Sequence, residues 1–322
     1  MPSRCRSPWT SVRRSRDTAR VLLVFLDGVG IGRADPAVNP FFRARLPALS
    51  ALLGGEPPAL DRSSRRGPGA VAFPLSATLD VPGTPQSGTG QAALLTGASA
   101  AEIHGRHFGP WTPVRLRALV EERSLLRRAA DAGRSVAFAN AYPRGWPGDR
   151  GGRRIAGPPL AARGAGVLNR HEEHLASGDA VSSEIVNDGW RQHLGHGGLP
   201  DVTPQEAGRH LARISEKHEL TFWAHYATDT AGHRGEMSGA VTALERVDAF
   251  LSGVLEACPP DTLVLLVSDH GNIEDVRVGH TLNPALGVAA GTAPGLIADA
   301  ADSLRDIRDV TPFLLDLLDV GD

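Results

Sequence analysis

Three segments of the chain are almost entirely apolar, and each has the length of a single strand. They are residues 20–26 (RVLLVFL), 220–226 (LTFWAHY) and 262–267 (TLVLLV). Continuous apolar runs of this kind are typical of strands that are covered on both faces. Segments with the apolar spacing of helices lie between and after these runs, at residues 42–53, 87–96, 239–257 and 310–318. Alternating strands and helices predict an α/β fold with a mostly parallel sheet flanked by helices.

Residues 98–217 have a different character, because they are rich in Arg, Gly, Pro and His. They contain one clear strand pattern (SVAFAN) and two helical patterns, at residues 135–140, 180–193 and 204–216. The many Gly and Pro residues leave the topology of this stretch open. We predict a catalytic core of residues 20–97 and 218–322, with residues 98–217 inserted as a smaller α/β cap or substrate domain.

The size and charge of the chain exclude several classes of protein. With 322 residues and 41% hydrophobic content, the chain can bury a large core. Its formal net charge of −2 gives no overall basic field, so we expect no nucleic-acid partner. No apolar run approaches the roughly 20 residues that a membrane-spanning helix needs, so we expect no membrane partner. The oligomeric state stays open, and a monomer is compatible with the sequence.

The N-terminal residues and the cysteines bear on the location of the protein. The first 20 residues contain six Arg against one Asp, with four Ser. A transit-like segment is one interpretation, but no apolar signal-peptide core precedes the first strand, so we expect residues 1–19 to be a disordered extension. Two cysteines, Cys5 and Cys258, cannot build a disulfide framework. A reducing cytoplasm is therefore the simplest location.

Side chains that bind metals gather in five short segments near the ends of apolar runs. The segments are Asp27-Gly28, PQSGTGQ around Ser87, Asp229 with His233, Asp269-His270, and GHTLNP with His280. In α/β sheets the functional site forms at the carboxyl ends of strands, where Asp27 and Asp269 are expected to lie. The segments supply three carboxylates, three imidazoles and a hydroxyl. This set is enough for two divalent cations with a nucleophile between them, which points to phosphoryl transfer.

The Gly-rich turn after Asp27 has a second interpretation. The sequence from Gly28 to Gly32 resembles the start of a dinucleotide-binding fingerprint, which would indicate an oxidoreductase. The fingerprint requires a Gly where this chain has Arg33, and no well-placed acidic residue closes a second strand. A Walker-type phosphate loop is absent, and any Lys-dependent chemistry would have to use Lys217, the single Lys of the chain.

Ser87 precedes an apolar helical stretch, where a Ser is first of all an N-cap. In the functional interpretation, backbone N–H groups and the helix dipole at the same position receive a phosphate on the hydroxyl. The segment is not the Gly-x-Ser-x-Gly elbow of α/β-hydrolases, because residue 85 is Pro. A non-catalytic metal-binding protein would keep the Asp and His ligands and tolerate the loss of Ser87.

The Asp and His motifs also have simple structural explanations. Asp229 and His233 would face the same side of a helix, but a capping Asp and a surface His are common. Asp269 and His270 converge only if their strand has ended, which the following Gly-Asn permits. The HEEH sequence at residues 171–174 lacks HExxH spacing and is interpreted as a solvated helix start. Surface or substrate-contact roles are assigned to His104, His107, His193 and His196.

With these residues in order, the chain resembles the metalloenzyme family of the alkaline phosphatase superfamily, whose members include cofactor-independent phosphoglycerate mutase and phosphopentomutase. The resemblance covers about residues 20–97 and 220–320. It rests on Asp27-Gly28, QSGTGQ with Gln91 where these mutases often carry His, DTAGH at 229–233, SDHGN at 268–272 and GHTLNP at 279–284. It implies an alkaline-phosphatase-like core with an inserted cap.

The resemblance implies a role for each ligand residue. Two divalent cations, Mn²⁺ or Zn²⁺, would be bound, one by Asp27, Ser87, Asp269 and His270 and the other by Asp229, His233 and His280. Lys217 resembles, at a spacing that differs by one residue, a Lys before the returning core strand of the longer mutases, and is the second catalytic candidate. Candidates for gripping a small phosphorylated metabolite are Arg106, His107 and Arg144, since Arg binds phosphate and carboxylate in a fork.

We therefore expect phosphoryl transfer on a small phosphomonoester through a phosphoserine at Ser87. Water would then release the phosphate in a phosphatase, or a retained substrate hydroxyl would take it back in a phosphomutase, depending on how the inserted region closes. That region is shorter than in phosphoglycerate mutases and lacks their Arg-rich motifs. Phosphodiester or pyrophosphate cleavage stays open, whereas the Cys/Ser-x-Pro-x-Arg motif of sulfatases is absent around Ser87.

Overall fold

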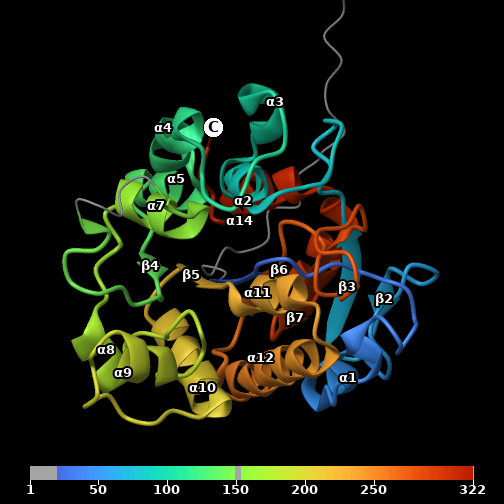
Figure 1. The fold of residues 1–322 in the computed structure, drawn as a ribbon. Coiled ribbons are helices and arrows are strands. Elements are labelled where there is room, and N and C mark those ends of the chain that lie inside the picture. Colours follow the sequence, from blue (N-terminus) through green and yellow to red (C-terminus); the bar gives the residue numbers. More distant parts are fainter. Residues whose placement is uncertain (1–19, 149–153, 322) are drawn as a thin grey trace, which may run out of the picture.

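A computed structural model describes residues 20–148 and 154–321 (Figure 1). Its centre is a seven-stranded sheet with the order β2-β3-β7-β6-β1-β5-β4. The strands are β1 (Arg20–Leu26), β2 (Arg65–Arg66), β3 (Ala70–Leu75), β4 (Val136–Phe138), β5 (Leu220–His225), β6 (Thr262–Val267) and β7 (Ala285–Gly291). The neighbours β4, β5, β1 and β6 are parallel, whereas β7 is antiparallel to both β6 and β3. The prediction of an α/β fold with a mostly parallel sheet is confirmed.

Helices cover both faces of the sheet because its central strands are apolar on both sides. Leu23 and Phe25 of β1 belong to one hydrophobic cluster, and Leu22 and Val24 belong to another. The first cluster includes α2 (Ser87–Thr96), α4 (Val114–Arg123), α5 (Leu125–Asp131), α7 (Gly157–Gly164), α13 (Pro294–Ser303) and α14 (Val310–Leu317). The second includes α1 (Pro47–Leu53), α10 (Pro204–Glu216), α11 (Ala227–Arg234) and α12 (Met237–Ala257). Figure 1 shows α2 and α12 on opposite sides of the sheet.

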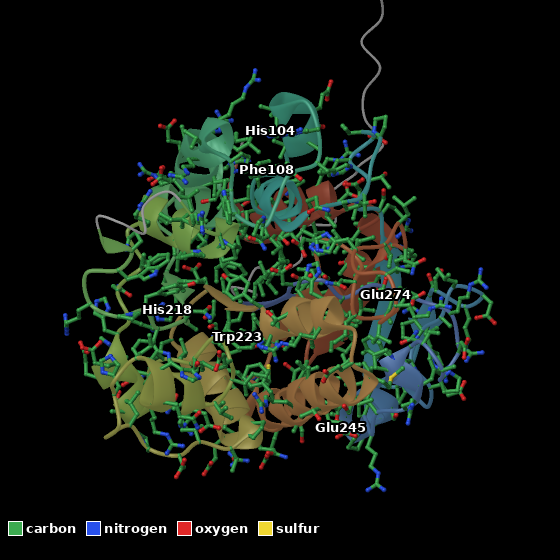
Figure 2. The ribbon with its side chains drawn as sticks, in the orientation of Figure 1. His104, Phe108, His218, Trp223, Glu245 and Glu274 are labelled. Carbon is green, nitrogen blue, oxygen red and sulfur yellow. The ribbon has the colours of Figure 1, made fainter. Side chains whose placement is uncertain are left out.

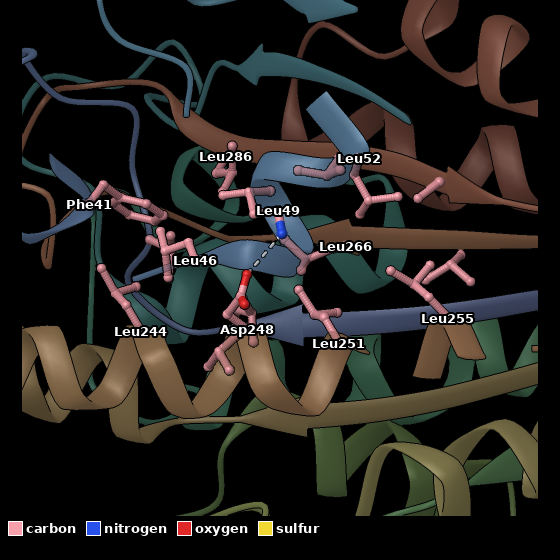
Figure 3. Close-up of a pocket in the computed structure, with 16 residues that line it drawn as sticks. Phe41, Leu46, Leu49, Leu52, Leu244, Asp248, Leu251, Leu255, Leu266 and Leu286 are labelled. Carbon is pink, nitrogen blue, oxygen red and sulfur yellow. Dashed lines mark hydrogen bonds between the residues drawn. The ribbon is translucent and has the colours of Figure 1, made fainter. Parts of the chain in front are cut away.

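A buried carboxylate fixes the start of α1 on the second face. Asp248 of α12 accepts hydrogen bonds from the backbone N–H groups of Ala48 (3.0 Å) and Leu49 (2.8 Å). Beside it, Figure 3 shows a small apolar cavity of about 40 Å³ between α1, α12 and the sheet. Because the first N–H groups of a helix lack partners within the helix, this carboxylate replaces the missing side-chain cap of α1.

Two predicted helices are shorter than their sequence patterns. The pattern at 180–193 gives a helix only from Asp188, in α9 (Asp188–His193), because Val181 bridges to Asn140 and Ile185 has a positive φ of 72°. The pattern at 42–53 is divided into a short turn, η1 (Pro40–Phe42), and α1. A Pro occupies the first position of α1, where its missing N–H costs nothing.

Residues 98–217 contribute to the main sheet and to the helices that cover it. Strand β4 extends the main sheet beside β5, and helices α4, α5 and α7 share the first hydrophobic cluster with α2. A small cluster of its own consists of Ala141, Leu175, Ala180, Trp190 and Leu199, near α8 (Glu172–Ser177) and α9. Two further short helices of the described residues are α3 (Ala100–His104) and η2 (Ile307–Asp309). The division into a core and a cap domain at residues 98 and 217 stays a prediction.

The predicted N-terminal extension and the expected lack of a membrane-spanning helix have different outcomes. The predicted extension at residues 1–19 lies outside the described residues. Among the described helices, none combines the length and the apolar character that crossing a membrane requires.

Candidate metal centre

The strand ends bring the predicted ligand segments together at one edge of the sheet. Val267 of β6 pairs with Phe25 of β1 in parallel register. Asp269 and Asp27 each follow two residues after this pair, so they leave the sheet at the same level. His225 pairs with Leu26 on the other side of β1, and α11 begins two residues after it. Because parallel strands end at the same edge, three of the five segments follow directly from the sheet topology.

The first cluster lies at the ends of β1 and β6 and is buried. It contains Asp27, Asp269 and His270, whose ligand atoms all lie within 4.8 Å of one another. The Nε2 atom of His270 lies 3.3 Å from Oδ1 of Asp27 and 3.7 Å from Oδ2 of Asp269. Ser87 joins this cluster, since its Oγ lies 3.0 Å from the same Nε2. The hydroxyl is therefore held among two carboxylates and an imidazole.

The second cluster contains Asp229 and His233 of α11 together with His280. The Nε2 atom of His233 lies 3.3 Å from Oδ2 of Asp229, and that of His280 lies 3.4 Å from Oδ1. The two Nε2 atoms are 3.0 Å apart. The ring centroids of His280 and His270 are separated by 4.0 Å, so the two clusters adjoin.

The chemistry of these donors fits divalent cations. Oδ1 of Asp27 and Oδ2 of Asp269 are buried and have no hydrogen-bond partner. Burial raises the pKa of Asp27, and burial with the charge of Asp27 raises the pKa of Asp269 well above its usual value. Burial opposes protonation of His270, but Asp269 and Asp27 raise its pKa to about 10. Buried carboxylate oxygens that lack hydrogen-bond partners would be satisfied by a bound cation, which would take the place of these protons.

Backbone carbonyls orient two of the imidazoles. Nδ1 of His280 lies 2.9 Å from the carbonyl oxygen of Pro85, and Nδ1 of His270 lies 3.2 Å from that of Gly271. A carbonyl accepts only an N–H, so each Nδ1 carries the proton in the neutral ring and each Nε2 offers a lone pair toward its cluster. This arrangement is usual for imidazoles that bind metals.

Ser87 is the first residue of α2, and the N-cap is Gln86, which makes no side-chain cap hydrogen bond. The N-cap interpretation of Ser87 is therefore wrong: its hydroxyl contacts His270 across 183 residues of sequence. The side chain is 1% exposed and lies at the positive end of a ten-residue helix. A negative charge on the Ser87 oxygen is favoured at this position.

Gln91 and Asn272 each donate a hydrogen bond to a carboxylate of the two clusters, which their sequence motifs did not predict. The amide of Gln91 donates to Oδ2 of Asp27 (3.0 Å) and accepts from the N–H of Gly157 (2.9 Å) at the start of α7. The amide of Asn272 donates to Oδ1 of Asp229 (2.6 Å). Both residues belong to motifs that were recognised, but their partners are distant in sequence.

The predicted substrate and Lys residues are placed outside the two clusters. Nζ of Lys217 lies 3.4 Å from Oδ1 of Asp179 and is mostly exposed. Arg144 pairs with Glu173 on the surface of the inserted region, whereas Arg106 lies exposed on the loop after α3. His107 comes nearer the nucleophile, because its Nε2 lies 3.1 Å from the carbonyl oxygen of Val81 and the next residue accepts a hydrogen bond from Thr89 of α2.

The dinucleotide interpretation of the Gly-rich turn is wrong. Such a fingerprint leads from a strand directly into a helix whose N-terminus faces the phosphates. Here the chain after β1 runs through a loop, and its first α-helix, α1, begins only at Pro47. The glycines serve close packing instead: a Cβ at Gly28 would lie 2.5 Å from Oδ1 of Asp229.

The sequence and the fold are both similar to those of known proteins. The sequence model of the Metalloenzyme superfamily matches residues 199–313. The chain is similar to 2,3-bisphosphoglycerate-independent phosphoglycerate mutases. That of Desulforudis audaxviator is 35% identical over 133 residues, which cover 37% of this chain and 25% of the relative. That of Halobacterium salinarum is 33% identical over 99 residues, covering 29% and 19%. The matched region thus spans about a quarter or less of these relatives.

Solved structures share the fold over nearly the whole chain. A protein of Pyrococcus horikoshii superposes with a TM-score of 0.54 at 13% identity, covering 95% of this chain and 98% of that one. The alkaline phosphatase of the Antarctic bacterium TAB5 gives a TM-score of 0.50 at 10% identity, covering 95% and 99%. At these identities the likeness is one of fold. The sequence over residues 199–313 and the fold of nearly the whole chain thus both resemble metalloenzymes of the alkaline phosphatase superfamily.

Proposed function

We propose that the protein transfers the phosphoryl group of a small phosphomonoester through a phosphoserine at Ser87, as a phosphatase or a phosphomutase. The observation that carries the proposal is the position of Ser87. Its buried hydroxyl lies at the start of α2, 3.0 Å from Nε2 of His270. A Ser in this position, next to two adjoining clusters of Asp and His, has the surroundings of an activated nucleophile.

Asp27, Asp269 and His270, with Ser87, would bind one cation, and Asp229, His233 and His280 would bind the other. When bound, the cations would stabilise negative charge on the phosphoryl oxygens and lower the pKa of the Ser87 hydroxyl. Mixed carboxylate and imidazole ligands suit Mn²⁺ or Zn²⁺.

The residues of the chain supply the nucleophile and its surroundings. In the first step the Ser87 hydroxyl loses its proton and its Oγ forms a bond to phosphorus. The bond from phosphorus to the leaving oxygen of the substrate breaks, and this oxygen takes up a proton and leaves as an alcohol. The helix dipole of α2 favours the negative charge of the bound phosphate. In the second step water or a substrate hydroxyl attacks phosphorus, and the bond to Ser87 Oγ breaks.

We propose that the segment after α3 takes part in substrate recognition. His107 is the best placed of the predicted substrate residues, because its segment packs against the start of α2. Arg106 and Arg144 remain candidates for a conformation in which the inserted region contacts the substrate. Lys217 is assigned no step, since its ammonium pairs with Asp179.

Hydrolysis of p-nitrophenyl phosphate tests this proposal. The metal-stripped protein should gain activity when Mn²⁺ or Zn²⁺ is added, and Ser87→Ala should lower that activity by at least about 1,000-fold, as loss of a nucleophile does in other enzymes. Ser252→Ala, at an exposed position of α12, is the matched control and should keep full activity. Equal activity of Ser87→Ala and the wild type would refute the phosphoserine route.

A further inference from the structure

Glu274 is a buried carboxylate that the proposed mechanism does not use. It follows β6, five residues after Asp269, and is 1% exposed (Figure 2). Its Oε2 accepts hydrogen bonds from the backbone N–H groups of Gly30 (2.9 Å) and Asn272 (2.7 Å). Its Oε1 accepts from the hydroxyl of Thr281 (2.5 Å) and the amide of Asn283 (3.1 Å). Four donors therefore converge on one side chain.

These donors belong to the loops that carry the metal-ligand candidates. Gly30 is three residues from Asp27, Asn272 is two residues from His270, and Thr281 is adjacent to His280. The hydrogen bond from Gly30 to Glu274 joins the loop after β1 to the loop after β6, although the two residues are 244 positions apart in the sequence. One carboxylate thus connects the backbone of the loops that carry the first cluster with side chains of the segment that carries His280.

Three glycines make room for this carboxylate. A Cβ at Gly30 would lie 2.5 Å from Cδ of Glu274, and a Cβ at Gly32 would lie 2.8 Å from its Cγ. A Cβ at Gly271 would overlap its Oε1. None of these three glycines has a positive φ, so close approach and not backbone conformation requires Gly at these positions. Gly30 and Gly32 of the Gly-x-Gly-x-Gly sequence after β1 thus form part of the wall of a carboxylate pocket, whereas its first glycine, Gly28, lies against Asp229.

We propose that Glu274 is a positioning residue that holds the two ligand clusters in their relative placement. The inference rests on the proposed function only in that the clusters bind cations. If Glu274 loses an acceptor oxygen, some of the four N–H and O–H groups that it binds are left buried without a partner. We expect the loops that carry these groups to shift as a result. The loops carry His270 and His280, so the expected consequence is weaker binding of metal.

Metal affinity of matched variants tests this inference. Glu274→Gln keeps the volume of the side chain but replaces one acceptor oxygen by a donor NH₂ group. Gly30→Ala keeps the carboxylate but adds a methyl group that would overlap it. Both should weaken binding of Mn²⁺ or Zn²⁺, measured by calorimetry on the stripped protein, by roughly 10- to 100-fold. The control for loss of a buried carboxylate is Asp248→Asn, which removes an acceptor from the start of α1 (Figure 3). The control for an added methyl is Gly239→Ala, where nothing lies within 4 Å.

The outcomes separate a positioning role from a merely structural one. Asp248→Asn should lower the stability to urea without changing metal affinity. Gly239→Ala should also leave metal affinity unchanged, and it should slightly raise stability because Ala is the better helix former within α12. Unchanged affinity in both Glu274→Gln and Gly30→Ala, or an equal loss in Asp248→Asn, overturns the inference. If one of the two site variants fails to fold, the other decides. Wild-type protein that binds cations yet does not turn over a phosphomonoester would refute the proposed function while leaving this test intact.

Discussion

At the scale of single residues, the seven candidate ligands could be predicted because each follows an apolar run or belongs to a compact motif. Asp27 directly follows β1, and the structure brings it to 3.3 Å from His270. The supporting residues could not be predicted in the same way. Gln91, Asn272 and Glu274 act through hydrogen bonds to residues up to 244 positions away, and a local pattern carries no sign of them.

Gln91 is expected to stabilise the folded protein through its two buried hydrogen bonds. Gln91→Leu leaves the N–H of Gly157 and Oδ2 of Asp27 without these partners. We expect the free energy of unfolding in urea to fall by about 1–3 kcal/mol. Gln205→Leu, at an exposed position of α10, is the control and should change stability little. Equal stability of Gln91→Leu and the wild type would contradict the assigned role.

At the scale of elements, strongly apolar segments were predicted best. The runs at 20–26 and 262–267 became β1 and β6 with the same bounds, and the pattern at 87–96 became α2. Strands β3 (AVAFPL) and β7 (ALGVAAG) were missed, because Ala, Gly and Pro give a weak strand signal. Both are stabilised by pairing with each other, which is a tertiary contact.

The end of β5 gives the protein a predictable dependence on pH. His225 is 1% exposed, its Nδ1 lies 2.7 Å from the carbonyl oxygen of Ser183, and burial lowers its pKa to about 4. In the unfolded chain the imidazole takes up a proton near pH 6.5, so the unfolded state binds more protons between about pH 6.5 and 4. The contribution of His225 to stability is therefore present above pH 6.5 and is lost as the pH falls.

Urea unfolding at two pH values measures this contribution. Between pH 7 and 5 the wild type should lose about 2 kcal/mol more unfolding free energy than His225→Asn, whose amide keeps a donor for Ser183 and does not titrate. The comparison of the two proteins removes the contribution of the other titrating groups. The same loss in both proteins would show that His225 is not held neutral.

At the scale of the whole molecule, the sequence predicted a sheet whose carboxyl edge gathers the candidate ligands, and the structure brings these side chains together in two groups. The role of residues 98–217 was harder to predict, because their strand β4 and helix α10 pack onto parts of the chain that follow them in sequence. Sequence proximity gives no information about such packing. Residues 98–217 therefore support the main sheet and α2 directly, through β4 beside β5 and through Gly157 against Gln91.

The central claim is that two adjoining ligand clusters each bind one divalent cation next to Ser87. The most direct measurement is the number of Mn²⁺ or Zn²⁺ ions bound per chain, determined by equilibrium dialysis of the stripped protein. The account predicts two for the wild type and one for the Asp229→Ala/His233→Ala double variant, which retains Asp27, Asp269 and His270. A wild-type protein that binds no cation tightly, or a double variant that still binds two, would contradict it.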